Sequence, residues 1–439
     1  MLNKVKNLIS LDNPLRLLYH KIRAIIANVV YGFPHKDMLI IGITGTNGKT
    51  TTCNIVARGL IESGKKVFMF STVNIIVNDE EFTNNTKMTS PDAFELQKWL
   101  AYAKNKGCEI AVIETASHGI KMSRIWGLNY DIVALTNISQ DHLDLHKTME
   151  DYVATKLEIF KNIMFYKRKS GVKKVAVINI DSDYAELFTS ETYDTLFTYG
   201  KNYKANLQPQ NIKTTIEGTE FSLKIPGDDI KIKTKLIGEF NVYNIMCAVG
   251  IFSSLGFSRE LIEKAISKTS GIPGRMDLLE SEDGVKIYID YAHTEDALKN
   301  VLQTFKSLEG VKRIITVFGA TGDRDKTKRP VMGQIVAEYS DLIILTEDDN
   351  YSEDVHEIMK DIIPGIERKE GEGFWIIPER KEAITTALIA ARKGDIVLLA
   401  GKGDEHKIMR NNGPEEWHDK TIAQEILNEI KENKLVVKK

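Results

Sequence analysis

Residues 38–52 decide the fold, and they read Met-Leu-Ile-Ile-Gly-Ile-Thr-Gly-Thr-Asn-Gly-Lys-Thr-Thr-Thr. An apolar run, typical of a buried strand, leads into a loop of Gly and Thr, and a helical pattern follows. In such a loop, backbone N–H groups approach phosphate oxygens, Lys49 adds positive charge and Thr50 offers a hydroxyl to Mg²⁺. Ile43 stands where the strict pattern G-x-x-x-x-G-K-[ST] has its first glycine. The stretch therefore predicts a variant nucleotide-binding loop, and an incidental Gly/Thr-rich turn is the alternative.

The composition is that of a globular protein. The chain has 439 residues, 42% hydrophobic and 27% charged, which is enough for two or three domains. A net charge of −2 argues against a general binder of nucleic acid or anionic membranes. Cys53, Cys108 and Cys247 lack metal-ligand spacing and fit thiols in a reducing cytoplasm, where we expect the protein. No apolar run reaches the ~18 residues of a membrane span, and the N-terminus does not resemble a signal peptide.

Residues 1–36 form a separate opening segment that we predict to contain an amphipathic helix. Arg16, Lys21 and Arg23 lie between apolar residues that recur at helical spacing, which are Leu18, Ile22, Ile25, Ile26, Val29 and Val30. The favoured interpretation packs this apolar stripe on the domain that follows. Contact of residues 15–33 with a membrane surface is the alternative.

Apolar runs alternate with helical patterns from Met38 to about Ser139, which predicts parallel strands with crossover helices. The expected fold class is α/β, with a central phosphate-loop ATPase domain at residues 37–272 whose sheet is mostly parallel. A Rossmann-like α/β domain is expected at residues 273–439. Residues 195–235 are polar and rich in turn residues, which predicts antiparallel hairpins. Gly and Pro at residues 271–276 mark the linker.

Polar side chains follow the strands expected near residues 110–114 and 132–136. Glu114 ends the first strand, and the second leads to His142. The carboxyl ends of parallel strands meet at one edge of a sheet, so these groups should lie near the phosphate loop and could ligate Mg²⁺. A structural role remains open for Glu114, as does a capping role for His142, because imidazole is an unusual Mg²⁺ ligand. Lys156, in a helix expected over residues 149–162, is interpreted on its own as a solvated surface lysine.

The C-terminal part shows strands near 286–290, 313–318, 342–346 and 396–400, each followed by a polar loop. Four polar loops on one edge of a sheet indicate a binding site rather than four separate turns.

These motifs, in their order, resemble the Mur ligase family, the ATP-dependent amide-forming enzymes of cell-wall peptide synthesis and their folylpolyglutamate synthetase relatives. The resemblance covers roughly residues 38–439 and looks closest to the branch that adds the third residue of the peptide. Besides the phosphate loop, the motifs that carry it are Thr89-Ser90-Pro91-Asp92, residues 114–119, Asp141-His142-Leu143-Asp144, Lys156, residues 240–244, Gly274-Arg275-Met276, residues 290–294, residues 322–325 and residues 401–405.

The resemblance implies a role for each matching residue. The ATP phosphates would be held by Gly45, Thr46, Asn47, Gly48, Lys49, Thr50 and Thr51. Mg²⁺ would be held by Thr50, Glu114 and His142, together with a carbamate formed on Lys156. The catalytic group would comprise Lys49, Lys156, His142 and Glu114. Asn241 and Asn244 would touch adenine, while Arg275 and Asp290 would reach phosphates and ribose. Thr89, Ser90 and Arg124 would contact a nucleotide-sugar peptide, and the remaining substrate residues would be His293, Arg324, Asp349, Asn350, Gly401 and Glu405.

The implied reaction is the joining of a carboxylate to an amino acid. ATP would phosphorylate the carboxylate, and the amine would then displace phosphate from the acyl phosphate. The resemblance implies ATP and Mg²⁺ as cofactors, and domain closure to unite the two reactants. We expect small-molecule substrates, no nucleic-acid partner and a monomer.

Three departures from the family pattern bear on the substrate. Only 36 residues precede the ATPase domain, where these ligases usually carry a uridine-binding domain. Ala116 and Met122 replace a serine and a glutamine. Asp349-Asn350-Tyr351-Ser352 replaces the Asp-Asn-Pro-Arg of diaminopimelate users, and serine cannot pair bidentately with a distal carboxylate. The sequence therefore disfavours diaminopimelate. Glu353 and Asp354 could receive an amine such as that of lysine, with solvated acidic residues as the alternative.

Two other hypotheses stay open. The same chemistry could act on a pseudomurein-type peptide, folate or a polyglutamate chain. The chain could instead be a non-catalytic nucleotide-binding scaffold, although the joint presence of Lys49, Glu114, His142 and Lys156 argues against that.

Overall fold

The computed structural model describes residues 13–86, 88–140, 143–225, 227–269 and 271–432. The chain divides into two compact units, each described here by itself. Unit 1 comprises Met1–Lys213, Thr219–Lys235 and Phe240–Ser270; unit 2 comprises Thr214–Gly218, Leu236–Glu239 and Gly271–Lys439. The domain boundaries expected after residues 36 and 272 stay predictions.

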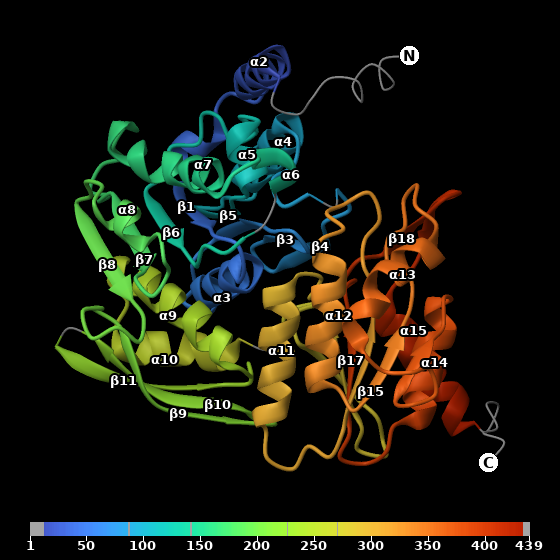
Figure 1. The fold of residues 1–439 in the computed structure, drawn as a ribbon. Helices are drawn as coiled ribbons and strands as arrows, with labels where there is room; N and C mark the ends of the chain where they lie inside the picture. The colour runs from blue at the N-terminus through green and yellow to red at the C-terminus, as the bar shows by residue number, and fades with distance from the viewer. Residues whose placement is uncertain (1–12, 87, 141–142, 226, 270, 433–439) are drawn as a thin grey trace. The chain divides into compact units, whose positions relative to one another are not determined.

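Unit 1 is built on an eight-stranded sheet with the order β4-β3-β2-β5-β1-β6-β7-β8 (Figure 1). Its strands are β1 (Leu39–Thr44), β2 (Val67–Phe70), β3 (Asn74–Val77), β4 (Glu80–Thr83), β5 (Ile110–Glu114), β6 (Ile132–Leu135), β7 (Val175–Asn179) and β8 (Thr195–Tyr199). The central strand β1 pairs in parallel with both β5 and β6. The loops after these three strands therefore leave the same edge of the sheet, which is where the phosphate loop begins.

The helices of unit 1 follow the crossover pattern expected of a mostly parallel sheet. They are α2 (Pro14–Val30), α3 (Lys49–Glu62), α4 (Ala93–Asn105), α5 (Ser117–Lys121), α6 (Leu143–His146), α7 (Met149–Lys161), α8 (Ala185–Thr189), α9 (Glu239–Ser254) and α10 (Arg259–Lys268). Short 3₁₀ helices span Pro34–Asp37 and Ile163–Phe165.

The antiparallel strands differ in part from the prediction. A three-stranded sheet of β9 (Gln208–Thr215), β10 (Gly218–Ile225) and β11 (Asp228–Thr234) forms as expected. The prediction is wrong for residues 195–199, because β8 pairs in parallel with β7 at the edge of the large sheet. An edge strand is buried only in part, so its sequence lacks the continuous apolar run of a central parallel strand. The antiparallel pair β3–β4 was not foreseen.

Unit 2 is a six-stranded sheet with the order β12-β13-β17-β14-β15-β16. Its strands are β12 (Asp277–Glu280), β13 (Lys286–Asp290), β14 (Ile314–Phe318), β15 (Leu342–Leu345), β16 (Phe374–Ile376) and β17 (Ile396–Ala400), with a separate hairpin of β18 (Lys407–Arg410) and β19 (Gly413–Glu416). Its helices are α11 (Glu295–Ser307), α12 (Lys328–Tyr339), α13 (Val355–Ile366), α14 (Arg380–Ala390) and α15 (Asp419–Lys431). Within the six-stranded sheet, the described pairs other than β12–β13 are parallel, so the predicted α/β class is confirmed.

The opening helix α2 forms, but the favoured prediction for its apolar stripe is wrong. Ala24, Ala27 and Asn28 face the protein and are buried, whereas the large aliphatic residues of the stripe are exposed. The small side chains pack against Ala93 on α4, with Phe94 and Trp126 beside them. Among the described residues, no helix is both long enough and apolar enough to cross a bilayer.

Candidate active site

The phosphate loop is held in shape by the segment that follows β6. Thr46 N donates to Asn137 O at 2.9 Å, and Asn47 N donates to Asn137 Oδ1 at 2.8 Å. Thr136 Oγ1 donates to Asn47 O at 2.6 Å. Asn137 was not among the predicted site residues, although it follows β6, the strand next to β1. The loop conformation is thus set by neighbouring protein groups, which prepares it for an anion.

Gly48 sits at the N-terminus of α3 with φ +81°, in close contact with Asn244. A Cβ atom on Gly48 would lie 2.1 Å from Asn244 Oδ1, and one on Gly45 would lie 1.9 Å from Thr136 Oγ1. Asn244 Nδ2 in turn donates to Asn241 Oδ1 at 3.1 Å. The structure therefore brings both predicted adenine contacts to the base of the phosphate loop.

This contact makes a prediction with an internal control. Gly64 also has φ +81°, but nothing lies within 4 Å of its hypothetical Cβ. We expect Gly48→Ala to lower the free energy of unfolding by about 1–3 kcal/mol more than Gly64→Ala, because only Gly48 adds a clash to the backbone strain. Urea unfolding of both variants measures the difference, and binding of a fluorescent ATP analogue should weaken only in Gly48→Ala. Equal losses in the two variants would show that the clash relaxes freely.

Glu114 is the centre of a buried network at the end of β5. Thr50 Oγ1 donates to both carboxylate oxygens, at 3.1 and 3.0 Å. Thr72 donates to the same carboxylate through N at 2.7 Å and through Oγ1 at 3.0 Å. The Thr72 hydroxyl also lies 2.8 Å from Thr89 Oγ1. Thr50 and Glu114, two predicted metal ligands, thus lie in one network with the predicted substrate residue Thr89. Thr72 links them and was not marked by any sequence motif.

Lys156 is buried, so its interpretation as a solvated surface lysine is wrong. Its side chain is 1% exposed, and Nζ donates to Gly45 O at 2.7 Å. Nζ also lies 4.6 Å from the ring centroid of Tyr152, whose hydroxyl is 3.0 Å from Thr46 Oγ1. A lysine on α7 therefore reaches the phosphate loop, as the family resemblance implies.

The predicted contacts to the nucleotide-sugar peptide form a second cluster beside this network. Ser90 Oγ accepts from Ala116 N at 3.1 Å, and Arg124 Nη1 donates to Ser90 O at 2.9 Å. Burial lowers the pKa of Arg124. Thr89, Ser90 and Arg124 are thus brought together at the edge that carries Glu114.

His142 and Asp141 lie outside the described residues, so the position of His142 is not given. His146, which sequence reasoning missed, is buried nearby, with Nδ1 at 3.4 Å from Asp151 Oδ2 and its ring 5.2 Å from that of Tyr152. Desolvation lowers the pKa of His146 to about 4, so this imidazole is neutral at pH 7.

In unit 2, Asp290 and Arg275 lie around Tyr291 at the end of β13. Asp290 accepts from Met276 N at 2.7 Å and Ala292 N at 2.8 Å, and burial raises the pKa of this carboxyl. The Arg275 guanidinium lies 4.5 Å from the Tyr291 ring centroid. His293 Nδ1 is 2.6 Å from Tyr291 O. The resemblance assigned Arg275 and Asp290 to the nucleotide and His293 to the substrate. The structure brings all three residues into one cluster.

The predicted amino-acid site is organised by a residue that the prediction missed. Lys402 is fully buried, and Nζ donates to Asp349 Oδ1 at 2.6 Å and to Glu405 Oε2. Burial opposes the charge, but Asp348, Glu405 and Asp349 together hold the pKa of Lys402 above its usual value. A Cβ on Gly401 would lie 2.4 Å from Asp348 Oδ2. The cluster thus carries more negative than positive groups, which favours an ammonium group as its ligand.

Asn350 and Arg324 complete the predicted residues of this unit. Asn350 is buried, with Nδ2 donating to Glu347 Oε2 at 3.3 Å, while Oδ1 has no hydrogen-bond partner among the described residues. Arg324 is exposed on the loop that follows β14. Glu347 also pairs with Arg410 at 2.6 Å, and neither of these two was predicted.

Glu353 has a structural partner, so the suggestion that it receives a substrate amine is wrong. Its carboxylate accepts from Arg329 Nη2 at 2.9 Å and Nη1 at 3.0 Å, and Lys326 Nζ lies at 2.8 Å. These bonds lower the pKa of Glu353 to about 2. Asp354 caps α13 by accepting from His356 N at 2.8 Å. Ser352 Oγ donates to Asp323 Oδ1 at 2.7 Å and so helps to order the loop.

Glu353 therefore makes stability depend on pH. Its folded-state pKa is about 2 against an ordinary value of 4.5, so its contribution is complete above pH 4.5 and is lost as pH falls towards 2. We expect Glu353→Gln to lower the free energy of unfolding at pH 7 by about 1–2 kcal/mol, less than for a fully enclosed pair because Glu353 borders solvent. Urea unfolding at pH 7, 4 and 3 should show the gap to wild type closing. The exposed Glu357→Gln is the control, and a gap that does not depend on pH would contradict the assignment.

Two groups of residues could hold a metal ion. Thr50 and Glu114 offer hard oxygen donors beside the phosphate loop, which suits Mg²⁺. Among the described residues, Asp404, His406 and His418 also converge, with His418 Nε2 3.2 Å from Asp404 Oδ1. A site with two imidazole donors suits Mg²⁺ poorly. The Mg²⁺ prediction therefore stays with the phosphate-loop site, where the structure describes Thr50, Glu114 and Lys156.

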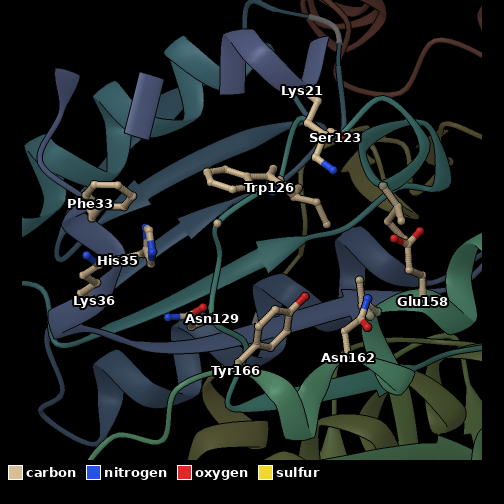
Figure 2. Close-up of a pocket in the computed structure, with 14 residues that line it drawn as sticks. Lys21, Phe33, His35, Lys36, Ser123, Trp126, Asn129, Glu158, Asn162 and Tyr166 are labelled. Atoms are coloured by element: carbon tan, nitrogen blue, oxygen red, sulfur yellow. The ribbon is translucent and has the colours of Figure 1, made fainter. Parts of the chain in front are cut away.

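A cavity of about 510 Å³ lies at the other end of the unit 1 sheet (Figure 2). Its lining comes from the segment before β1, from the segment before β6 and from α7, and includes Phe33, His35, Lys36, Trp126, Gly127, Asn129 and Glu158. Because β1 and β6 are parallel, this is the edge opposite the phosphate loop. The cavity contains none of the predicted site residues.

Comparison with known proteins agrees with this arrangement. Residues 43–252 match the Mur ligase middle domain, and residues 274–403 match the glutamate ligase domain of Mur ligases. The UDP-N-acetylmuramoyl-L-alanyl-D-glutamate–2,6-diaminopimelate ligase of Syntrophomonas wolfei is 36% identical over 404 residues, which cover 92% of this chain and 81% of that relative. A solved structure of a ligase with that name is 30% identical, with a TM-score of 0.64 over 94% of this chain and 83% of the other.

A second solved structure extends the likeness of fold. The folylpolyglutamate synthase of Mycobacterium tuberculosis has a TM-score of 0.70 at 16% identity, covering 91% of this chain and 95% of that one. At such identity the match concerns the fold alone. The domain matches and the 36% identical relative together show that this chain belongs to the Mur ligase family.

Proposed function

We propose that this protein is an ATP-dependent ligase that adds the third residue to the peptide of a UDP-N-acetylmuramoyl-dipeptide. The observation that carries the proposal is the buried Lys156, which reaches Gly45 in the phosphate loop beside the Thr50–Glu114 pair. A protein that only binds nucleotide has no need of a second lysine at the loop, and Lys156 is buried there. The 36% identical relatives are named for this reaction.

In the proposed mechanism, unit 1 binds the ATP phosphates. The N-terminus of α3 and the Lys49 ammonium attract the phosphate oxygens and stabilise charge on the transferring phosphoryl group. Thr50 and Glu114 would hold Mg²⁺, with His142 as the family's further ligand, and bound Mg²⁺ neutralises phosphate charge. Thr72 and Thr89 orient Glu114 through the hydrogen bonds already described. Asn241 and Asn244 would contact adenine.

We assign to Lys156 a carbamate formed with CO₂. A carbamylated Nζ keeps one N–H, which suffices for the bond to Gly45 O. The modification turns a buried cation into an anion, which adds a negative group next to the metal ligands. The amine nitrogen attacks the carbon of CO₂ and loses a proton, which leaves the carbamate anion.

The chemical steps follow from the ligands. A carboxylate oxygen of the acceptor attacks the γ-phosphorus, and ADP leaves. The amino nitrogen then attacks the acyl carbon, the bond to the phosphate oxygen breaks, and the nitrogen loses a proton. Arg275 and Asp290 would serve the nucleotide, while Thr89, Ser90 and Arg124 would hold the acceptor. In unit 2, the acidic surroundings of Lys402 suit the ammonium of the amino acid, with Arg324, Asn350, Gly401 and His293 completing its site.

Of the proposed substrates, the amino acid that is added is the one whose identity is least constrained by the structure. The relatives are named for 2,6-diaminopimelate, which we take as the first candidate. Lysine is the second candidate. It is favoured because Ser352 replaces the arginine of diaminopimelate users. It is not placed first because Glu353, which could have received its amine, is paired with Arg329.

A substrate panel tests the proposal. UDP-N-acetylmuramoyl-dipeptide, its uridine-free form and a folate are each combined with diaminopimelate, lysine or glutamate, and products are identified by mass spectrometry. We expect ADP release only when the UDP-linked acceptor and one diamino acid are both present. Product from folate and glutamate would move the activity to the folylpolyglutamate branch. ATP hydrolysis indifferent to both substrates would contradict ligation.

A further inference from the structure

Helix α2 presents its large apolar side chains to solvent, on the outside of unit 1 beside α4 (Figure 1). The exposed fractions are 46% for Ile22, 47% for Ile26 and 62% for Val29. Eight large residues of this one helix are exposed: Leu15, Leu18, Tyr19, Ile22, Ile25, Ile26, Val29 and Val30. At 100° per residue they occupy a continuous stripe of about 140° of the helix circumference.

The helix is fixed in this orientation by specific contacts on its other face. Asn28 is fully buried, and Nδ2 donates to Ala24 O at 2.9 Å and to Trp126 O at 3.0 Å. Arg23 Nη2 donates to Asp92 Oδ1 at 2.9 Å, and the guanidinium lies 5.1 Å from the Phe94 ring centroid. The bond to Ala24 O lies within α2, but the bond from the buried Asn28 to Trp126 O would be lost if the helix turned its stripe inward. The exposure of the stripe is therefore a property of the packed helix.

The charges of α2 are of one sign and flank the stripe. Arg16 and Arg23 lie along one border and Lys21 lies along the other, at 100° per residue. Residues 13–36 contain no Asp or Glu, although the whole chain carries a net charge of −2. Arg23 is paired with Asp92, so the positive charge where the apolar stripe meets solvent comes from Arg16 on one border and Lys21 on the other.

We propose that α2 lies in the plane of an anionic membrane surface, with the stripe inserted among the lipids and the basic residues at the headgroups. An apolar stripe bordered by Lys and Arg, without acidic residues, is the pattern of an interfacial helix. The opposite sign of charge on anionic lipids complements the helix. A protein partner would have to match both the apolar stripe and two basic borders, whereas a bilayer offers this layering along the whole helix. The proposal is independent of the ligase reaction.

Flotation of the full chain with vesicles tests the proposal. We expect binding to vesicles of phosphatidylcholine with phosphatidylserine to exceed binding to phosphatidylcholine alone by about tenfold or more at low salt, because each basic residue near the surface contributes. The double variant Ile22→Glu/Ile26→Glu should abolish binding without unfolding the protein, since both side chains are exposed. Phe165→Glu/Leu187→Glu, at exposed apolar residues elsewhere in unit 1, should bind as wild type does.

A fluorescent probe separates insertion from adsorption. The three native cysteines are buried, so a probe on Ile26→Cys can be compared with one on Leu187→Cys. We expect a blue shift with anionic vesicles only at position 26. Failure of the wild-type chain to float, or floating without a blue shift, would overturn the proposal. So would concentration-dependent dimerisation that Ile22→Glu/Ile26→Glu abolishes while vesicles stay unbound, because the stripe would then be an interface between copies.

Discussion

Lys49→Ala should lower kcat/KM by about a thousandfold or more, the largest effect we expect from a single substitution. The lysine supplies the mobile positive charge of the phosphate loop, and its loss removes stabilisation that grows as charge spreads over the transferring oxygens. In the structure Nζ donates to Thr46 O at 2.7 Å, within the loop itself. The measurement is ADP release that depends on both acceptor and amino acid.

The exposed Lys65, on the segment after the same helix, offers a matched control. Lys65→Ala removes an equal charge and should leave the rate within a factor of about two. Thermal unfolding of both variants checks that the fold persists. If Lys49→Ala retained a tenth of the wild-type rate, the loop would not be acting as a phosphoryl-transfer site.

Lys156→Ala should reduce the rate by about a hundredfold, and short carboxylic acids should restore part of it. The substitution removes the proposed carbamate and the bond to Gly45 O, and leaves a cavity beside Tyr152. Formate or acetate can enter that space and return the missing negative charge, which a purely structural defect would not respond to. Rates with and without the added acid are the measurement.

Lys161→Ala provides the control, because that lysine is exposed at the end of the same helix. Wild-type activity should also fall in buffer stripped of CO₂ and recover with bicarbonate, whereas Lys156→Ala should be indifferent to both. Full activity in Lys156→Ala would reject the carbamate. A loss of activity that no acid restores would leave Lys156 as a structural support of the loop.

The sequence predicts the strands whose residues are buried on both sides and the loops that follow them. β1, β5 and β6 are continuous apolar runs, so their positions and polar ends could be anticipated. The pairing of the edge strands β4 and β8 could not, because an edge strand is only partly buried and its pattern does not separate parallel from antiparallel pairing. The buried side of α2 was also predicted wrongly. The small side chains of Ala24 and Ala27 allow a close contact with α4, and no local sequence pattern indicates such a contact.

Residues inside recognisable motifs could be proposed as site residues from the sequence, whereas residues that join these clusters only through tertiary contacts could not. The local sequence around Lys156 predicted a solvent-exposed lysine. Only the family resemblance predicted that Lys156 lies at the phosphate loop. Thr72 and Lys402 carry no signal of their own; they matter because folding brings each beside a carboxylate, Glu114 or Asp349. Lys402 can be recognised as a buried cation between two acids only once the structure shows that it is buried.

The contact between Gly48 and Asn244 limits how this protein could be redesigned. Gly48 belongs to the proposed binding site for the phosphates and Asn244 to the proposed site for the base, yet a single methyl group cannot fit between them. A substitution at Asn244 that changes the nucleobase preference would therefore also alter the binding of the phosphates. Engineering towards GTP would need compensating substitutions in the glycine-rich turn, chosen together rather than one after another.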